Sequence, residues 1–184
     1  MHDAAQRYGC AIAGTLVVKE NDQYLNRFYF YKPDGSFAHY DKRHLFGNEK
    51  QLFTAGEKRT IVNWKGFRIL LQTCYDLRFP GFARNRNDYD IALYAASWPS
   101  SRQDAWTTLL KARAIENQCY VLGANRTGDD PCLHYTGGSV AYSFSGALMT
   151  DLKDKICAKS VEIDLQSLTS FRQKFPFLQD ADTY

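Results

Sequence analysis

Apolar and polar residues alternate along residues 24–32, YLNRFYFYK, and this period of two predicts a half-buried β-strand. Pro33, Asp34 and Gly35 follow as a turn signal, because proline presets the backbone angle φ and glycine accepts a strained position. The run over residues 37–42 then returns as a second strand. Residues 24–42 are therefore predicted to form a β-hairpin.

Beyond the hairpin the pattern changes to strands that alternate with helices. The predicted strands are a buried run at 10–18, before the hairpin, and later runs at 60–64, 67–74, 90–97, 119–127, 138–144 and 155–164. The predicted helices are 3–8, closed by Gly9, a helix after Pro80, 101–117 with Ser100 or Ser101 as its cap, and 165–175; residues 43–57 are predicted to be a loop. This order predicts an α/β (α+β) domain with mixed sheets in layers.

The composition of the chain is that of an ordinary globular domain. It has 184 residues, 45% of them hydrophobic and 23% charged, without repeats or linkers, so residues 1–184 are interpreted as a single domain. Apolar runs fall short of the roughly 20 residues that a membrane helix needs. The amino terminus, MHDAAQRYGC, lacks the layout of a signal peptide. We therefore expect no membrane association.

The basic residues are spread along the chain. The net charge is only +3 and no basic stripe is visible, which argues against a nucleic-acid partner. The five cysteines include no C-x-x-C pair and no accompanying histidine cluster, so neither a metal site nor a disulfide framework is expected. Cys10, Cys119 and Cys157 are predicted to be small buried hydrophobes, and a reducing cytoplasm is the expected location.

Cys74 differs from the other cysteines because it stands where a long apolar strand ends and a polar turn begins. At such a strand-to-helix elbow a thiol points out of the sheet, near backbone N–H groups that lower a thiol pKa and can hold an oxyanion. A core cysteine at a strand end explains the position equally well. Lys42, at the end of the hairpin, and Glu49, in the polar loop, would each alone be solvated surface groups.

Several longer motifs occur together, in one order, from about residue 10 to the carboxyl end. They are YDKRHLF (40–46), Glu49 ahead of FTAGE (53–57), CYDLRFP (74–80), LKARAIENQCYV (110–121), NRTG (125–128) and HYTGGS (134–139), with Trp98 of ASWP and the closing KFP (174–176). With these motifs the chain resembles the nitrilase, or carbon–nitrogen hydrolase, superfamily and within it the omega-amidase-like branch.

The resemblance implies a four-layer α-β-β-α sandwich and a set of site residues. Cys74 would be the nucleophile, Lys42 and the backbone N–H of Tyr75 would hold the oxyanion, and Glu49 would position the catalytic groups. Trp98 would either line the substrate pocket or pack in the core. The implied reaction is hydrolysis of the terminal amide of monoamides such as 2-oxoglutaramate, through a Cys thioester. The resemblance implies a homodimer or larger homo-oligomer, and neither a cofactor nor a metal.

One part of the family pattern has no counterpart in the sequence. The superfamily's general base is a first glutamate in a Pro-Glu motif, within an amino-terminal strand–helix–strand unit. Since no acidic residue before Lys42 stands in that context, the chain is expected to be an amino-terminally truncated member with impaired activity. The alternative is a catalytically inactive member that acts as a structural or interaction protein.

Other charged motif residues have simpler interpretations. Arg113 and Glu116 stand three positions apart on a predicted helix, so we expect an ion pair. Asp76 and Arg78 are expected to support the elbow around the nucleophile. His44 suggests a Cys–His protease, but the sequence lacks the His–Asn signature of that class.

Overall fold

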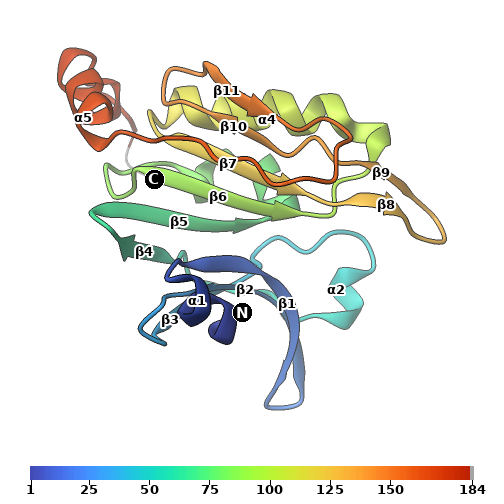
Figure 1. Ribbon diagram of the computed structural model, residues 1–184. Helices are drawn as coiled ribbons and strands as arrows, with labels where there is room; N and C mark the ends of the chain where they lie inside the picture. Colours follow the sequence, from blue (N-terminus) through green and yellow to red (C-terminus); the bar gives the residue numbers. More distant parts are fainter. Residues whose placement is uncertain (183–184) are drawn as a thin grey trace.

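The computed structural model describes residues 1–182 and contains two facing β-sheets with helices on their outer sides (Figure 1). The smaller sheet is antiparallel, in the order β1-β2-β3. Its strands are β1 (Ile12–Glu20), β2 (Gln23–Tyr31) and β3 (Phe37–Asp41). The pairing of Phe28 with Tyr40 confirms the predicted hairpin.

The larger sheet has six strands in the order β11-β10-β7-β6-β5-β4. The strands are β4 (Ile61–Trp64), β5 (Phe67–Thr73), β6 (Ile91–Ala96), β7 (Tyr120–Asn125), β10 (Val140–Tyr142) and β11 (Leu148–Asp151). The three central strands, β5, β6 and β7, run parallel, whereas the outer pairs are antiparallel. Parallel neighbours need a crossover, and helical segments supply it between each pair.

Helices occupy the outer faces and the ends of the sheets. The α-helices are α1 (His2–Tyr8), α2 (Glu49–Leu52), α3 (Pro80–Ala83), α4 (Gln103–Glu116) and α5 (Leu165–Lys174). Short 3₁₀ helices span Cys74–Arg78, Ser100–Arg102 and Phe177–Gln179. A small hairpin, β8 (Thr127–Asp129) with β9 (His134–Thr136), extends from the end of the sheet opposite α5 (Figure 1).

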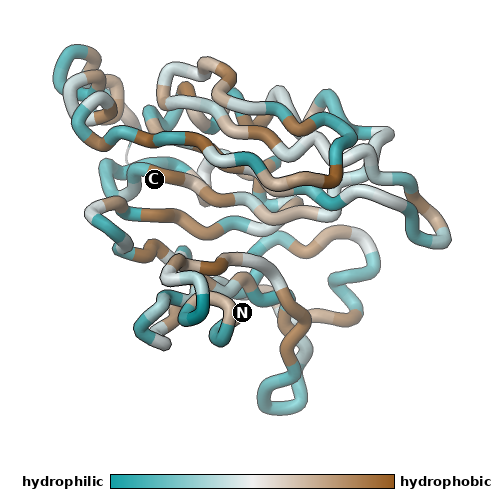
Figure 2. The backbone as a smooth tube through the Cα atoms, viewed as in Figure 1, coloured by the Kyte–Doolittle hydropathy of each residue, from teal (hydrophilic) through white to brown (hydrophobic). Residues whose placement is uncertain are grey.

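Two apolar layers stabilise the fold. Successive side chains of β5 point to opposite faces of the sheet, so this strand contributes to both layers. Ile69 and Leu71 point toward the smaller sheet, into a layer with Phe28 and Phe30. Leu70 points the other way, toward α4. Brown, hydrophobic stretches accordingly recur along the strands of the larger sheet in Figure 2, between paler and teal stretches. Burial on both faces explains why the central strands are near-continuous apolar runs.

The outer face of the smaller sheet carries α1. The ring of His2 lies 6.2 Å from that of Tyr31, which points away from the interior layer. The order of layers is therefore α1, the smaller sheet, the larger sheet and α4. This arrangement confirms the predicted α/β fold with mixed sheets in an α-β-β-α order.

A buried ion cluster attaches α5 to the larger sheet. Asp90, just ahead of β6, accepts hydrogen bonds from Arg68 at 2.7 Å and from Arg172 of α5 at 2.9 Å. Burial by itself would raise the pKa of the Asp90 carboxyl, but the Arg68 hydrogen bonds and the Arg172 charge outweigh it and hold that pKa below its usual value. The final helix is thus held by charge as well as by apolar packing.

Several local predictions are wrong. Residues 155–164 form no strand; they run along the molecule without sheet pairing. Residues 10–18 were expected to be buried, but Leu16 and Val17 of β1 are 51% and 64% exposed, because β1 lies at the edge of its sheet in the described chain. The residue that caps α4 is Arg102, not Ser100 or Ser101. Residues 43–57, predicted to be a loop, contain α2, and the β8–β9 hairpin was not predicted.

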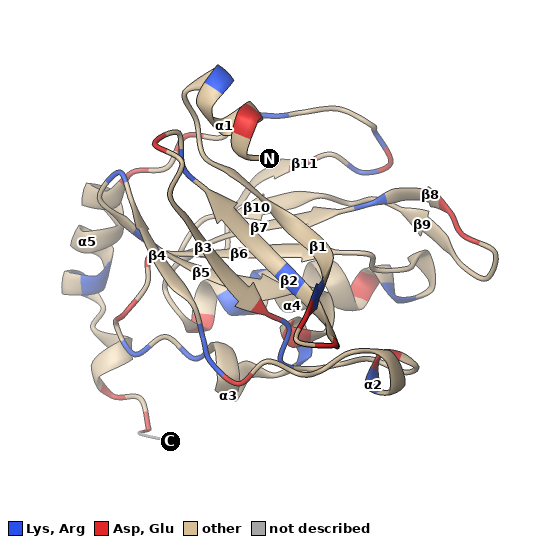
Figure 3. Cartoon of the chain, turned by 90° about the horizontal axis from the view of Figure 1, so that it is seen from below, with Lys and Arg blue, Asp and Glu red and all other residues tan. Residues whose placement is uncertain are grey.

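The charged positions also follow the sequence-based expectation. Lys and Arg are distributed over helices, strands and loops, with acidic residues among them (Figure 3). In the described part of the chain, no helix is long and apolar enough to cross a membrane.

Candidate active site

Cys74 occupies a sharp elbow between β5 and a 3₁₀ helix. β5 ends at Thr73, and Cys74 begins the helix with a φ of 47°, in the left-handed region that residues with a side chain rarely adopt. Such strain persists only where the surroundings enforce it, and it is found mainly at functional sites. Tyr75 is the second residue of the helix, so its backbone N–H has no partner within the helix.

Asp76 fixes the elbow from behind. Its buried carboxylate accepts hydrogen bonds from the Thr73 backbone N–H at 3.0 Å, the Tyr40 hydroxyl at 2.8 Å and the His44 backbone N–H at 3.0 Å. The His44 ring nitrogen Nδ1 lies 2.8 Å from the same carboxylate. The prediction that Asp76 supports the elbow is confirmed, and the ring of His44 belongs to this support.

Lys42 and Glu49 form a close ion pair beside the elbow. Lys42 follows β3 and its side chain is only 2% exposed, with Nζ 2.6 Å from Glu49 Oε2. Glu49 also accepts hydrogen bonds from the Phe46 backbone N–H at 2.7 Å and from Asn26 at 3.3 Å. The loop therefore folds back so that one carboxylate orients the buried ammonium group.

Gly56, in the FTAGE motif, holds the backbone of Lys42. Its N–H donates to the Lys42 carbonyl at 2.9 Å. A Cβ at this position would overlap the backbone carbonyl of Asp41. The motif glycine is thus explained by close approach of two backbone segments next to the site.

A cavity of about 360 Å³ opens in front of Cys74. Its lining residues are Phe46, Cys74, Tyr75, Arg78, Ser97, Trp98, Pro99 and Arg102. Trp98 packs in the core at 2% exposure and also lines the cavity, so its core packing is confirmed and its contact with substrate stays a prediction. The guanidinium of Arg78, the last residue of the elbow helix, lies over the Trp98 ring, 5.1 Å from the centroid, and its support of the elbow stays a prediction.

The electrostatics of Cys74 combine two opposing effects. Burial raises the pKa of the thiol above its ordinary value, while the nearby Lys42 ammonium lowers it. The Glu49 and Asp76 carboxylates add to the rise. The net direction is upward, so the neutral thiol is the resting form, contrary to the lowered pKa expected from the elbow position alone.

Some of the remaining predictions from the sequence are confirmed and others are wrong. Arg113 and Glu116 form the expected ion pair at 2.8 Å, and Arg113 also donates to the Leu77 carbonyl of the elbow helix. Cys119 is buried as predicted, but Cys10 and Cys157 are exposed. Phe46 and Arg102 line the cavity but were not predicted as site residues, although Phe46 ends the YDKRHLF motif and Arg102 lies shortly after ASWP.

The model of the family described as "Carbon-nitrogen hydrolase" matches residues 1–173. The chain belongs to the carbon–nitrogen hydrolase family. Among curated proteins, this carbon–nitrogen hydrolase is 44% identical over 182 residues to Omega-amidase YafV of Yersinia enterocolitica, covering 97% of this chain and 71% of that protein. It is 32% identical to 2-oxoglutaramate amidase of Bacillus subtilis, covering 96% and 70%.

Solved structures give the same result. XC1258 from Xanthomonas campestris, a CN-hydrolase superfamily protein with an arsenic adduct in its active site, superposes with a TM-score of 0.97 at 42% identity, covering 100% of this chain and 73% of that chain. A mutant amidase from Nesterenkonia sp. AN1, which carries the acetamide moiety of fluoroacetamide on its active-site cysteine, has a TM-score of 0.78 at 28% identity, covering 84% and 61%.

These relatives bear on two of the sequence interpretations. The matches cover nearly all of this carbon–nitrogen hydrolase and give no support to the prediction that it is truncated. They favour an amidohydrolase over the alternative of a catalytically inactive structural protein.

Proposed function

We propose that this carbon–nitrogen hydrolase is an omega-amidase, which hydrolyses the terminal amide of short 2-oxo dicarboxylic monoamides such as 2-oxoglutaramate. The observation that carries the proposal is that the Cys74 elbow opens on a cavity while the charges of the Lys42–Glu49 ion pair act on the Cys74 thiol. The names of the omega-amidase and 2-oxoglutaramate amidase relatives support the substrate class.

The reaction is a double displacement. The Cys74 thiolate attacks the amide carbonyl, and the Lys42 ammonium and the Tyr75 N–H stabilise the oxyanion of the tetrahedral intermediate. When the C–N bond breaks, the nitrogen takes up a proton and leaves as ammonia, and a thioester remains on Cys74. Water then attacks the thioester, which releases the 2-oxo acid and restores the thiol. Glu49 holds Lys42 in place through both steps.

The first step needs an acceptor for the thiol proton. In the part of the chain that the structure describes, the hydrogen-bond partner of the Cys74 sulfur is the Ser97 carbonyl, at 3.9 Å. The carboxylates of Glu49 and Asp76 are already engaged by Lys42 and by the elbow. We therefore propose slow turnover at neutral pH, since general acid–base catalysis typically contributes about 10²–10⁴-fold.

Two further properties belong to the proposal. A homo-oligomer is supported by the exposed Leu16 and Val17 on the edge strand β1, since an unpaired apolar edge favours association. A cytoplasmic location is supported by five free cysteines. Light scattering of the purified chain tests the first, and labelling of the thiols in intact cells tests the second.

The decisive experiment measures ammonia release from 2-oxoglutaramate by the chain and by its Cys74→Ala variant. Cys132→Ala is the matched control, because Cys132 is an exposed cysteine outside the cavity. We expect slow release that Cys74→Ala abolishes and Cys132→Ala preserves. Release that survives the loss of Cys74, or an unmodified chain that is inert on 2-oxoglutaramate and other small amides, rejects the proposal.

A further inference from the structure

Asn125 ends β7 and stands beside the segment that follows the neighbouring strand β6. It begins the NRTG motif, to which the proposed reaction gives no role. The residue is buried, with 9% of its surface exposed. Backbone pairing between β6 and β7 ends at the pair of Ala96 with Asn125. Ser97 and Trp98, which come next along the chain, therefore lie beyond the ladder of the sheet.

The side-chain amide of Asn125 binds both polar groups of the Trp98 backbone. The Trp98 N–H donates to Asn125 Oδ1 at 2.7 Å, and Asn125 Nδ2 donates to the Trp98 carbonyl at 2.9 Å. The same nitrogen also donates to the Gly137 carbonyl at 2.6 Å. The oxygen and the NH₂ group of the amide are thus both engaged. This side chain continues the hydrogen-bond pattern of the sheet past the point where backbone pairing ends.

The HYTGGS motif holds Asn125 from its other side. Gly137 of this motif has a φ of 76°, and a Cβ there would stand 2.8 Å from the Lys153 carbonyl, so glycine is the residue that fits. The hydroxyl of Ser139 accepts from the Asn125 N–H at 3.0 Å and donates to the Asn125 carbonyl at 3.1 Å. Three motif segments therefore meet at one buried side chain.

The peptide unit between Ser97 and Trp98 connects Asn125 to the nucleophile. The N–H of this unit is the one that donates to Asn125, and its carbonyl accepts a weak hydrogen bond from Cys74 Sγ at 3.9 Å. A trans peptide unit is planar, so its N–H and its carbonyl point in opposite directions. Holding the N–H on Asn125 therefore aims the carbonyl at the sulfur of Cys74.

We propose that Asn125 is a positioning residue for the nucleophile, because it fixes the Ser97–Trp98 peptide unit and through it the place of the Cys74 sulfur in the cavity. Asn125 does not itself line that cavity, so it acts through the backbone of the neighbouring segment. Hydrogen bonds that follow one another in such a chain strengthen each other. The effect on turnover rests on the proposed amidase function, whereas the effect on the thiol does not.

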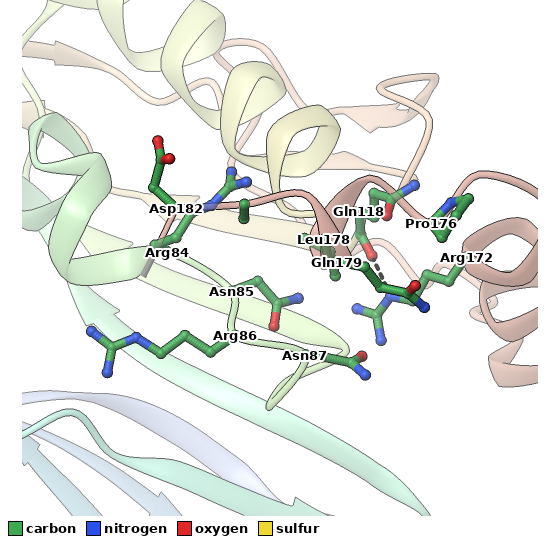
Figure 4. Close-up of a pocket in the computed structure, with 11 residues that line it drawn as sticks. Arg84, Asn85, Arg86, Asn87, Gln118, Arg172, Pro176, Leu178, Gln179 and Asp182 are labelled. Atoms are coloured by element: carbon green, nitrogen blue, oxygen red, sulfur yellow. Dashed lines mark hydrogen bonds between the residues drawn. The ribbon is translucent and has the colours of Figure 1, made fainter. Parts of the chain in front are cut away.

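Asn85 supplies a matched control at the other end of the larger sheet. It is also buried, its amide nitrogen donates to backbone carbonyls, and its amide oxygen accepts from backbone N–H groups. It precedes β6 and lines the larger cavity between residues 84–87 and the C-terminal segment (Figure 4). Asn125 and Cys74, by contrast, lie where parallel strands end. The two asparagines make similar bonds at opposite ends of the strands.

The S–H stretching band in the infrared spectrum tests the bond to Ser97 directly, since a hydrogen-bonded S–H group absorbs at a lower frequency than a free one. The Cys74 band is isolated in each background as the difference that Cys74→Ala makes. We expect this band to move to higher frequency in Asn125→Ala and to stay in place in Asn85→Ala. The band of Cys119, which donates to the Arg113 carbonyl at 3.8 Å, should be unchanged in Asn125→Ala and shows that the variant is folded.

Turnover gives a second measurement. In Asn125→Ala the kcat of ammonia release from 2-oxoglutaramate should fall about tenfold or more with KM little changed, since a misplacement of about 1 Å can cost about 10²-fold. Asn85→Ala should lower the midpoint of urea unfolding and keep the wild-type kcat. Asn125→Asp retains an acceptor for the Trp98 N–H, so it should return the Cys74 band toward the wild-type frequency.

An unshifted Cys74 band in Asn125→Ala overturns the proposal, as does an equal shift in Asn85→Ala. If Asn125→Ala does not fold, hydrogen exchange of the unmodified chain decides. The Trp98 amide proton should then exchange as slowly as those of β6, and exchange at the rate of an open loop refutes the role of Asn125. A shifted band without any ammonia release rejects the amidase and keeps the positioning role. Ammonia release with an unchanged kcat in Asn125→Ala rejects the positioning role alone.

Discussion

The ammonium nitrogen of Lys42 lies 2.6 Å from Glu49 Oε2, and the two side chains are 2% and 24% exposed. Burial of an unpaired charge is very costly, and the pairing of opposite charges offsets part of that cost for both groups. The Glu49 carboxylate is thus the counter-charge of the cation that stands near the thiol of Cys74.

Substitutions of the two partners should shift the reactivity of Cys74 in opposite directions. Lys42→Met removes the charge that lowers the thiol pKa, and Glu49→Gln removes a charge that raises it. At pH 8 we expect alkylation of Cys74 to slow in Lys42→Met and to quicken in Glu49→Gln, each by up to about tenfold, which corresponds to one pKa unit. Lys50→Met, on the same short helix as Glu49, is the control. Changes of the same sign in both variants would contradict the arrangement.

The unmodified thiol should titrate above the range of an ordinary cysteine. Burial raises its pKa, so the thiolate forms only as the pH passes well beyond about 8.5, the usual value for the residue. The alkylation rate of Cys74 should still be rising at pH 9. The measurement is the rate–pH profile of each cysteine in the same sample. A midpoint for Cys74 at or below about 8.5 would refute the prediction.

Asp90 should make the stability of the fold depend on pH in the acid range. Its folded-state pKa is held below the usual value, so its contribution is complete above about pH 4 and is lost as the pH falls through the folded pKa. Asp90→Asn should cost about 3 kcal/mol at pH 7, because it breaks a buried ion cluster. Urea unfolding should show this difference shrinking below pH 4. Asp180→Asn, at an exposed position, should leave the profile unchanged.

Gly56→Ala should disturb the site without touching the cavity. The added methyl group collides with the Asp41 carbonyl, next to Lys42, and overpacking of this kind costs about 1–3 kcal/mol. We expect a lower midpoint of urea unfolding together with slower labelling of Cys74, since Lys42 moves. Gly81→Ala is the matched control, because a Cβ at Gly81 meets no atom within 4 Å. A stability of Gly56→Ala equal to that of the wild type would show that the close contact is tolerated.

Local patterns in the sequence predicted much of the fold. The β2–β3 hairpin, the central strands and α5 follow directly from alternation, turn residues and helical spacing. The elements that were misjudged depend on partners that a local pattern does not contain. Residues 155–164 have strand-like composition but pair with no strand, and β1 is apolar yet exposed because it lies at a sheet edge.

The residues of the candidate site that belong to sequence motifs could be predicted, whereas the features that depend on packing in the folded chain could not. Cys74, Lys42 and Glu49 could be selected from the sequence, and the structure brings them together. The raised thiol pKa could not be predicted, because it depends on burial. Nor could the two arginines of the cavity be predicted, since Arg78 and Arg102 belong to different segments and only the folded chain brings both to the cavity lining.

The two halves of this site are carried by different sheets. Lys42 follows the last strand of the smaller sheet and Cys74 follows the second strand of the larger one, and Phe28, Ile69 and Leu71 fill the space between the sheets. That apolar layer is therefore also a spacer, whose thickness sets how far the ammonium group stands from the sulfur. Side chains that never contact a substrate therefore help to set the distance between the catalytic groups. The loss of a single methylene from this layer is expected to change the reactivity of Cys74 as well as the stability of the fold.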